Sequence, residues 1–534
     1  MEEKRDWKVI VDKKREIQKG LLSLHADHGT HCENPNSAAD VTDDFGELAA
    51  QLSRGELSSE EVLKVYINRA CKAHAKTNCL TEILFECALR RAKELDNYIT
   101  EHGRTVGPLH GIPVTLKDQF DIVGFDSTIG YVGRAFRPAT KNSALVDMLE
   151  SLGAIVMAKT NLPQSIMWCE TDNPLWGLTT NPLHSDYTPG GSTGGEAALL
   201  ASNASVLGWG TDIGGSIRIP SHMMGLYGFK ASSARLPYRG VPVSTEGQEH
   251  VPSSIGPMAR SLDAVHTAFK SLVELKPWDF DARCAAIPWR EDIYQDTTSR
   301  PLVIGVLFDD EVVRPHPPIV RVLRSVVGAL RDAGHYIVDW NAKLHAECVQ
   351  VMDQFYKVDG GEDIREAVKA GGEPFIPHVQ KLVDCGSPLS VFQYWQLNRK
   401  KWDLQQQYLD KWNEIRSAQG GQPVDVVIMP SMPHTSVPHG SCRWVGYTKV
   451  WNVLDYPAIV IPGGHVCEQD VSDNWSFEPR NAIDEWNKKL WEDNKGVMSS
   501  LKLPVGVQII GRRHADEMVL AAAKVVDDIL RAST

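Results

Sequence analysis

The sequence predicts an α/β fold in which a central, mixed β-sheet is covered by helices on both faces. Short, mainly apolar runs bounded by turn residues are typical of buried strands. Such runs recur at 154–158, 302–306, 336–338, 426–429, 458–461 and 505–510. Helical patterns at 319–333 and 516–530 alternate with them. Because alternation of strand and helix is typical of layered α/β proteins, the order of these elements indicates the fold class.

The N-terminal part, up to about residue 104, is predicted to be mainly helical. Ser58 and Glu61 have the spacing of a capping box, in which each side chain satisfies a backbone N–H group of the other residue. An apolar stripe with helical period follows over 63–70. A second helical pattern covers 81–101. We therefore expect two helices here that pack on the sheet.

Composition and charge exclude several classes of protein. The 534 residues are 42% hydrophobic and 23% charged, which are ordinary values for a globular protein and exclude a fibrous or mainly disordered chain. The net charge of −12 argues against a broad nucleic-acid or anionic-membrane surface, because such surfaces need a basic excess. No run approaches the roughly 18 apolar residues of a membrane span. We expect neither a nucleic-acid partner nor a membrane span.

The ten cysteines are scattered and form no CxxC pair, so neither a disulfide scaffold nor a cysteine zinc site is predicted. The charged N-terminus lacks the apolar core of a secretory signal. Both observations favour a reducing, cytoplasmic compartment. A cluster with metal-like spacing occurs at His25, His28, His31 and Cys32. Adjacent glycine and Asn-Pro residues indicate a loop, and we predict no metal site there.

Two serines lie in neighbouring glycine-rich motifs. Ser192 is the serine of PGGSTGGE, and Ser216 is the serine of TDIGGSIR. Glycines let the main chain approach a ligand closely and direct consecutive N–H groups into one pocket, as stabilisation of a tetrahedral oxyanion requires. Either motif alone is more typical of a structural turn. Their co-occurrence indicates a catalytic site.

A serine nucleophile needs a base, and Lys117 is the candidate. It follows the apolar run Ile112–Leu116, so it is expected at the end of a buried strand. Full burial lowers a lysine pKa by up to ~3–5 units, which would let a neutral amine accept a proton near pH 7. An exposed lysine at a strand end remains the alternative.

Other interpretations of the glycines fit less well. There is no GxxxxGK[ST] phosphate loop and no correctly spaced GxGxxG motif, so no cofactor is predicted. Residues 190–194 do match the GxSxG nucleophile elbow of α/β-hydrolases. That elbow needs an apolar strand immediately before it, whereas 183–189 is polar and ends in proline. An esterase using Ser192 is kept as the alternative enzyme.

Together these motifs resemble the amidase signature family of serine hydrolases. The resemblance is carried by the order of IPVTLKD, GGSTGGE and GTDIGGSIRIPS, and it covers about 105–265. Further matches, GPLHGIPVTLKDQ, IPWR and GVQIIGRR, are similar to the fungal acetamidase-type branch and extend over most of the chain. The resemblance implies the amidase signature fold and no cofactor or metal.

The resemblance also implies a Ser–Ser–Lys triad that hydrolyses a small carboxylic amide to the carboxylate and ammonia or an amine through an acyl-enzyme. Ser216 would be the nucleophile. Ser192, following a cis peptide bond, would relay protons, and Lys117 would be the base. The implied oxyanion hole consists of the backbone N–H groups of Ile213, Gly214, Gly215 and Ser216.

By the same resemblance, the acyl pocket should lie beside Ile166, Met167 and Trp168. Apolar residues there would suit small aliphatic or aromatic acyl groups, and the sequence does not choose among aliphatic, aryl and indole-type amides. The small-molecule amide is the only partner expected. A homodimer is left open.

Three further residues are expected to support the site. Thr193 replaces the serine usual at this position in the family and is expected to keep a supporting hydroxyl role. Asp212 and Arg218 are expected to hold the nucleophile loop, with an ordinary structural salt bridge as the equal alternative.

Since the three triad residues must converge, we expect few domains. The expected division is an N-terminal helical region, 1–104, packed on one catalytic domain, 105–534. That domain is expected to contain a signature core at 105–265, an inserted pocket wall at about 270–425, and C-terminal strands and a helix at 425–534.

A non-catalytic homologue and an amidotransferase-type subunit are the remaining alternatives. The complete triad argues against the first, and the lack of a basic excess disfavours the second. His110 invites a Ser–His interpretation, but we expect it to pack beside the strand that ends at Lys117.

Overall fold

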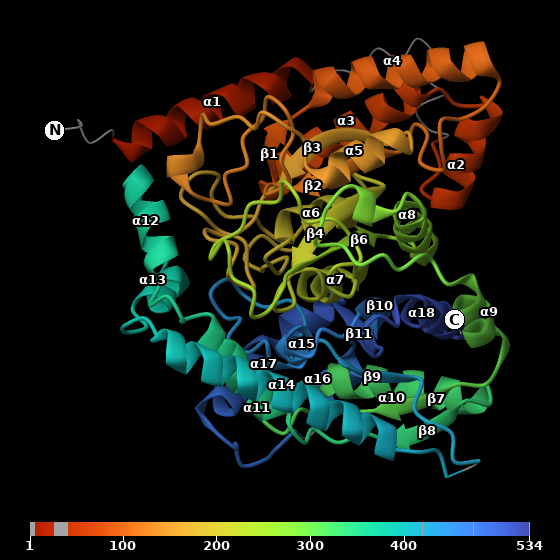
Figure 1. The fold of residues 1–534 in the computed structure, drawn as a ribbon, viewed down its shortest axis with the longest axis vertical. Helices are drawn as coiled ribbons and strands as arrows, with labels where there is room; N and C mark the ends of the chain where they lie inside the picture. The colour runs from red at the N-terminus through yellow and green to blue at the C-terminus, as the bar shows by residue number, and fades with distance from the viewer. Residues whose placement is uncertain (1–5, 26–40, 419, 474, 533–534) are drawn as a thin grey trace.

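A single β-sheet runs through the centre of the chain (Figure 1). The computed structural model describes residues 6–25, 41–418, 420–473 and 475–532. Within them, eleven strands lie in the order β1-β3-β2-β4-β6-β5-β10-β11-β9-β7-β8. β3, β2 and β4 are parallel to one another, as are β9, β7 and β8, and the other adjacent pairs are antiparallel. The predicted mixed sheet is therefore confirmed.

The strands are short and mostly buried. Their bounds are β1 Leu80–Ile83, β2 Pro113–Lys117, β3 Ile155–Thr160, β4 Leu207–Asp212, β5 Tyr227–Lys230, β6 Ser254–Ala259, β7 Val303–Val306, β8 Tyr336–Asp339, β9 Val426–Pro430, β10 Ala458–His465 and β11 Pro504–Ile510. Each of the six apolar runs named above coincides with one of these strands. Except for the edge strand β8, these strands are mostly buried on both faces of the sheet, which explains why their runs lack alternation of polar and apolar residues.

Helices precede, follow and connect the strands. The N-terminal half contains α1 Trp7–His25, α2 Phe45–Arg54, α3 Ser59–Thr77, α4 Phe85–His102, α5 Ala144–Ser151, α6 Gly194–Ala201, α7 Arg218–Met224 and α8 Leu262–Glu274. The C-terminal half contains α9 Glu291–Ser299, α10 Pro317–Asp332, α11 His345–Phe355, α12 Glu362–Gly371, α13 Pro377–Val383, α14 Val391–Glu414, α15 Gly446–Val453, α16 Glu468–Ser472, α17 Ala482–Ser500 and α18 Asp516–Ala532. No described helix is long and apolar enough to cross a membrane.

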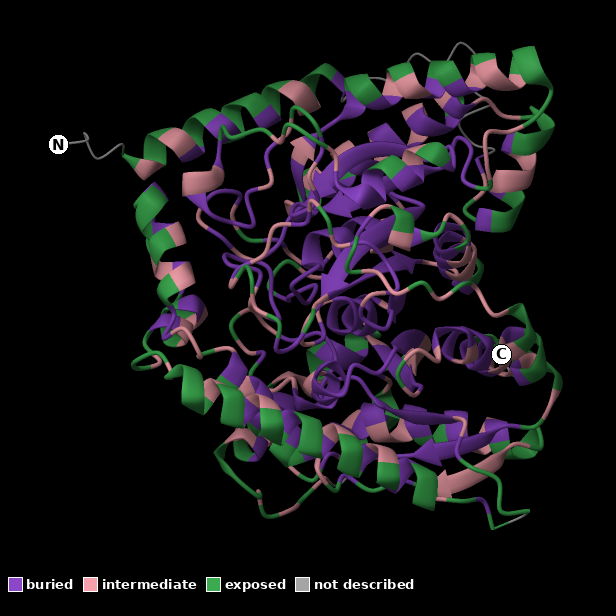
Figure 2. Cartoon of the chain, viewed as in Figure 1, coloured by how far each residue is buried: buried purple, intermediate pink, exposed green. Residues whose placement is uncertain are grey.

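Adjacent residues of β5 show that helices cover both faces of the sheet. Phe229 packs edge-on against Phe269 of α8, with ring centroids 5.0 Å apart. The neighbouring Gly228 faces Ser221 of α7, where a Cβ atom would collide with the serine side chain. Because consecutive strand residues point to opposite faces, α7 and α8 lie on opposite sides. Figure 2 shows the strands between them as buried.

The N-terminal region confirms one local prediction and corrects another. Ser58 and Glu61 form the expected capping box at the start of α3. The helical pattern predicted over 81–101 is wrong at its start, because β1 ends at Ile83 and α4 begins only at Phe85. β1 pairs with β3 at the edge of the sheet, so this region contributes a strand as well as helices.

The segment 270–425 does more than line a pocket. It supplies β7 and β8, which extend the sheet beyond β9 to its far edge. It also supplies α10, which begins at Pro317, a position where the missing N–H group of proline costs no helical hydrogen bond. The sheet is thus shared by the N-terminal, middle and C-terminal parts of the chain, and the site residues lie near its centre.

Candidate active site

Lys117 is the last residue of β2 and is wholly buried. Its Nζ donates to Ser192 Oγ at 2.7 Å and to Thr211 Oγ1 at 3.1 Å. Thr211 Oγ1 donates in turn to Gln119 Oε1 at 2.7 Å. Burial lowers the pKa of Lys117 to about 7, although the negative charge of Asp212 opposes the shift. The alternative of an exposed lysine at a strand end is therefore wrong.

Ser192 follows a cis peptide bond with Gly191 and is almost completely buried. A Cβ atom at Gly191 would lie 2.6 Å from the carbonyl oxygen of Glu170, so only glycine fits against this backbone. Turns and isolated bridges, rather than a strand, precede Ser192. The α/β-hydrolase elbow is consequently not formed, and the hydrogen-bond partner of the Ser192 hydroxyl is a lysine.

Ser216 lies in the loop between β4 and α7 and is partly exposed. Its carbonyl oxygen accepts the backbone N–H of Thr193 at 3.2 Å. This contact joins the two glycine-rich loops directly. The structure therefore brings Lys117, Ser192 and the Ser216 loop together from three separate parts of the chain.

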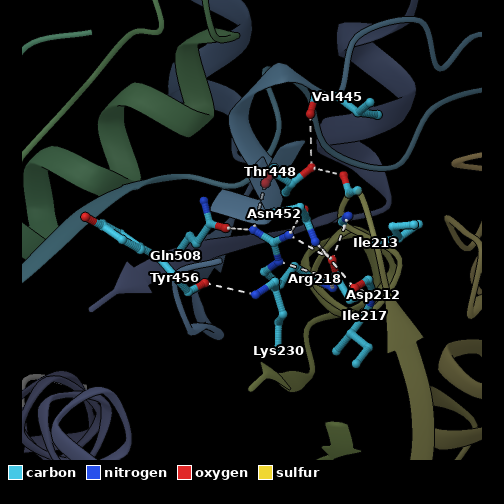
Figure 3. A network of polar contacts seen from close by, with 12 residues as sticks. Asp212, Ile213, Ile217, Arg218, Lys230, Val445, Thr448, Asn452, Tyr456 and Gln508 are labelled. Carbon is cyan, nitrogen blue, oxygen red and sulfur yellow. Dashed lines mark hydrogen bonds and ion pairs between the residues drawn. The ribbon is translucent and has the colours of Figure 1, made fainter. Parts of the chain in front are cut away.

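Asp212 and Arg218 hold the Ser216 loop through a buried network of polar contacts (Figure 3). Asp212 accepts hydrogen bonds from Arg218 Nη2 and the Gly215 N–H, both at 2.9 Å, and from Asn452 Nδ2 at 2.9 Å. Arg218 Nη1 donates to Gln508 Oε1 at 2.7 Å. Burial alone would raise the pKa of Asp212, but Arg218 lowers it well below its ordinary value. This is both a structural salt bridge and a support for the loop.

The backbone N–H groups of this loop differ in their hydrogen bonding. The Gly215 N–H is already hydrogen-bonded to Asp212. Among the described residues, the structure records no hydrogen-bond acceptor for the N–H groups of Ile213, Gly214 and Ser216. Three of the four donors expected for an oxyanion hole are therefore free to bind a ligand, and the fourth positions the loop.

The carbonyl side of the same loop contacts the C-terminal half of the chain. Thr448 Oγ1 donates to the Gly214 carbonyl at 2.7 Å. Tyr356 Oη lies 3.5 Å from the Ile213 carbonyl oxygen. A Cβ atom at Gly214 would lie 2.5 Å from Tyr356 Oη. The close approach of Tyr356 explains why glycine occupies this position.

Two cavities meet at Ser216. The first has a volume of about 280 Å³ and an apolar wall that includes Ile166, Met167, Trp168, Ile219 and Val445. The second, of about 450 Å³, is lined by Ser192, Thr211, Tyr238 and Ser244 among others. Ile166, Met167, Ile213 and Ser216 contribute to both cavities, whereas Trp168 lines only the first. The residues expected beside the acyl pocket thus surround an apolar cavity next to Ser216.

Other expected residues have different surroundings. Thr193 Oγ1 is buried and has no hydrogen-bond partner among the described residues, so its expected hydroxyl role is not seen. His110 Nδ1 accepts the Val106 N–H at 3.1 Å and does not line either cavity. His25 ends α1, while His28, His31 and Cys32 lie outside the described residues.

Several site residues were missed from the sequence. Gln119 and Thr211 lie within the motifs GPLHGIPVTLKDQ and GTDIGGSIRIPS, and their positions in these motifs were a usable signal. Three others contact the Ser216 loop from far away in the chain. Asn452 is 240 residues from Asp212, Gln508 is 290 from Arg218, and Tyr356 is 143 from Ile213. Nothing local in the sequence distinguishes these three side chains.

Comparisons with known proteins show what this chain is similar to. The family model described as Amidase matches residues 61–520. "Amidase 1" of Gibberella moniliformis is 50% identical over 98% of this chain and 100% of its own length. The acetamidase of Aspergillus oryzae is 37% identical over 91% of this chain and 89% of its own. A solved structure of fatty acid amide hydrolase matches with a TM-score of 0.85 and 31% identity, covering 98% of this chain and 95% of that one.

Proposed function

Since the chain belongs to the amidase family and is a hydrolase acting on amide bonds, we propose that it hydrolyses small carboxylic amides with Ser216, Ser192 and Lys117 as its catalytic triad. The observation that carries this proposal is the 2.7 Å contact between the wholly buried Lys117 amine and Ser192 Oγ. Ser216 stands where two cavities meet. Both observations support the proposed roles of Lys117 as base, Ser192 as relay and Ser216 as nucleophile.

Acylation begins with a neutral Lys117. Its amine accepts the proton of Ser192, Ser192 takes the proton of Ser216, and Ser216 Oγ attacks the amide carbonyl carbon. Negative charge develops on the carbonyl oxygen, where the free N–H groups of Ile213, Gly214 and Ser216 stabilise it. The Gly215 N–H, bound to Asp212, fixes the loop that carries these donors.

Collapse of the tetrahedral intermediate breaks the carbon–nitrogen bond. The proton held by Lys117 returns through Ser192 to the leaving nitrogen, and ammonia or an amine departs. Water then attacks the acyl-enzyme with the same relay removing its proton, which releases the carboxylate and restores Ser216. No proton is gained or lost by the triad over the cycle.

The proposed proton relay also indicates which cavity binds the leaving group and which binds the acyl group. The leaving nitrogen must reach Ser192, and Ser192 lines the second, more polar cavity rather than the first. We therefore assign the leaving group and the attacking water to the second cavity. The acyl group occupies the first cavity, whose apolar residues Trp168, Ile219 and Val445 do not line the second. A cavity of about 150 Å³ already accommodates benzene, so about 280 Å³ suits an acyl group larger than acetyl.

A comparison of single alanine variants tests the triad. Ser216→Ala, Ser192→Ala and Lys117→Ala are assayed on a panel of primary amides, anilides and esters. All three should lose amide hydrolysis, with kcat of Ser216→Ala reduced by at least about 10⁴-fold. Ser299→Ala, at the exposed end of α9, controls for loss of a serine elsewhere. Near-normal activity of Ser216→Ala would overturn the assignment, and loss confined to Ser192→Ala would favour the esterase alternative.

We also propose that the protein is located in the cytoplasm. This proposal rests on the scattered cysteines of the sequence, a pattern that suits a reducing compartment.

A further inference from the structure

We infer that the acyl cavity selects amides whose acyl group is apolar next to the amide and carries an anionic group, such as a carboxylate, at its far end. This inference rests on the proposed function, since it concerns the acyl half of the same substrate. It is based on the distribution of charge around the cavity that contains Ile166, Met167 and Trp168, called here the acyl cavity.

The rim of the acyl cavity carries an excess of positive charge. Its charged lining residues are Lys357, Arg443 and Lys449 against a single acid, Asp353. Asp353 Oδ1 is 2.5 Å from Lys449 Nζ, so these two charges are paired. In the described parts of the chain, Lys357 and Arg443 have no recorded carboxylate partner. Because the whole chain has a net charge of −12, a cationic rim is not what its composition alone would produce.

Arg443 is held in position before any ligand binds. Its guanidinium lies 3.4 Å from the ring centroid of Trp486. The preceding backbone is fixed by Glu170, whose buried carboxylate accepts the N–H groups of Gly440 at 2.7 Å and Cys442 at 2.9 Å. A guanidinium stacked on an aromatic ring keeps its in-plane N–H donors available and can bind a carboxylate through two of them.

Lys449 also lines the cavity and is held in position. It belongs to α15, its Nζ lies 5.1 Å from the Tyr356 ring centroid, and its side chain is 16% exposed. Lys357 follows Tyr356 directly and is exposed. The cations therefore belong to two segments that line the cavity, one with Lys357 and one with Arg443 and Lys449, so an anion at the rim would lie near several positive charges.

The apolar interior of the cavity determines where along the acyl group the anion can lie. Its inner wall is apolar, with Ile166, Ile219 and Val445 among its residues. An unpaired carboxylate placed against such a wall would lose hydration without compensation. The anion is favourable only at the rim, which requires an apolar spacer between it and the scissile amide.

Two matched series of substrates test the inference. One series consists of primary amides of increasing chain length that end in a carboxylate, and the other has the same lengths with a terminal isopropyl group in place of the carboxylate. We expect an optimum length at which the anionic amide has at least about a fivefold higher kcat/KM than its neutral partner. Raising ionic strength should reduce kcat/KM of the anionic series only. Equal or lower kcat/KM for the anionic amides at every length would overturn the inference.

Substitutions of the rim residues test whether their charges cause the preference for anionic amides. Arg443→Gln and Lys357→Met should each raise KM for the optimal anionic amide by roughly two- to fivefold, with a smaller effect on the neutral amide and little change in kcat. Asp353→Asn should lower KM for the anionic amide, because it removes the only negative charge of the rim. Lys381→Met removes an exposed lysine of α13 that does not line the cavity, and it should not change the preference.

The possible failures can be told apart. Hydrolysis of the neutral series without any preference for the anionic series, or equal effects of the rim variants on both series, would overturn this inference alone. A folded protein that hydrolyses neither series would overturn the proposed function together with the inference.

Discussion

Lys117 and Ser192 are hydrogen-bonded across 2.7 Å although 75 residues separate them in the chain. The lysine reaches this position because β2 is flanked by β3 and β4 in the parallel part of the sheet. It is wholly buried there, no salt bridge to it is recorded among the described residues, and burial lowers its pKa to about 7. This environment supports the proposed roles of Lys117 as base and Ser192 as its proton donor.

The first prediction concerns the pH dependence of catalysis. Only neutral Lys117 can accept a proton, so kcat/KM for a primary amide should rise with pH through an acidic limb centred near pH 7. Lys117→Met should reduce kcat by about 10²–10⁴-fold, and its residual activity should lack that limb. The measurement is a pH–rate profile with wild type and variant.

A matched control for this profile is Lys411→Met. Burial also lowers the pKa of Lys411 to about 7, but its Nζ donates to the Asn341 carbonyl and it lines neither cavity. The acidic limb should survive this substitution. Persistence of the limb in an active Lys117→Met enzyme would show that another group controls it.

The second prediction concerns the stability provided by Asp212. Asp212→Asn leaves the wholly buried Arg218 without its anionic partner, which should lower the free energy of unfolding by about 3–5 kcal/mol. Denaturant titration measures this loss. Lys524→Met removes an exposed pair with Asp528 and should cost less than about 1 kcal/mol. Similar losses for the two variants would contradict a structural role for the buried pair.

The third prediction concerns the loop that carries the N–H donors. In Gly214→Ala the new Cβ atom would lie 2.5 Å from Tyr356 Oη, so the loop or the tyrosine must move. We expect kcat/KM to fall by about 10- to 100-fold, since small displacements of catalytic groups are costly. Tyr356→Phe removes the obstructing hydroxyl and should restore part of the activity of Gly214→Ala. A double-mutant cycle measures this coupling, and strictly additive effects would argue against it.

The fourth prediction concerns a buried acid, Glu196 of α6, whose carboxyl group accepts hydrogen bonds from Thr115 and Thr160. Burial raises its pKa from 4.5 to about 8. The folded chain therefore binds this proton more tightly than the unfolded chain. The resulting stabilisation is complete below pH 4.5 and is lost as pH rises through about 8.

Glu196→Gln tests that sign. The neutral amide cannot ionise, so the variant should lose less stability than wild type between pH 6 and pH 8, a difference of at most about 1.4 kcal/mol per pH unit. Denaturant titrations across this range measure it. The exposed Glu101→Gln should follow the wild-type curve, and a Glu196→Gln curve parallel to wild type would contradict the raised pKa.

Strands whose residues are almost all apolar, and therefore buried, were predictable from the sequence. β9, β10 and β11 all begin within one residue of the expected position, because their apolar runs leave little choice of environment. β1 was missed since its sequence, LTEI, contains Glu82 and runs into a helix. That acid is compatible with a buried edge strand only because Lys14 of α1 lies 2.6 Å from it, a contact that no local pattern reveals.

In the site, too, residues specified by local motifs were predictable and residues brought in from distant elements were not. Lys117, Ser192 and Ser216 were identifiable because their motifs specify backbone geometry over a few consecutive residues. The supports of the Ser216 loop come from α15 and β11, and ordinary Asn and Gln side chains provide them. Such residues acquire their role only when the strands assemble.

The contact of Arg218 with Gln508 has a consequence for protein synthesis. Gln508 lies in the final strand, and its side chain also reaches the Tyr447 carbonyl at 3.2 Å. While the chain emerges from the ribosome, every residue of the proposed triad is present long before this strand is translated. The nascent chain then lacks one of the groups that satisfy Arg218, so the nucleophile loop is completed only near the end of translation. Prematurely terminated chains should therefore contain the whole triad without being competent to use it.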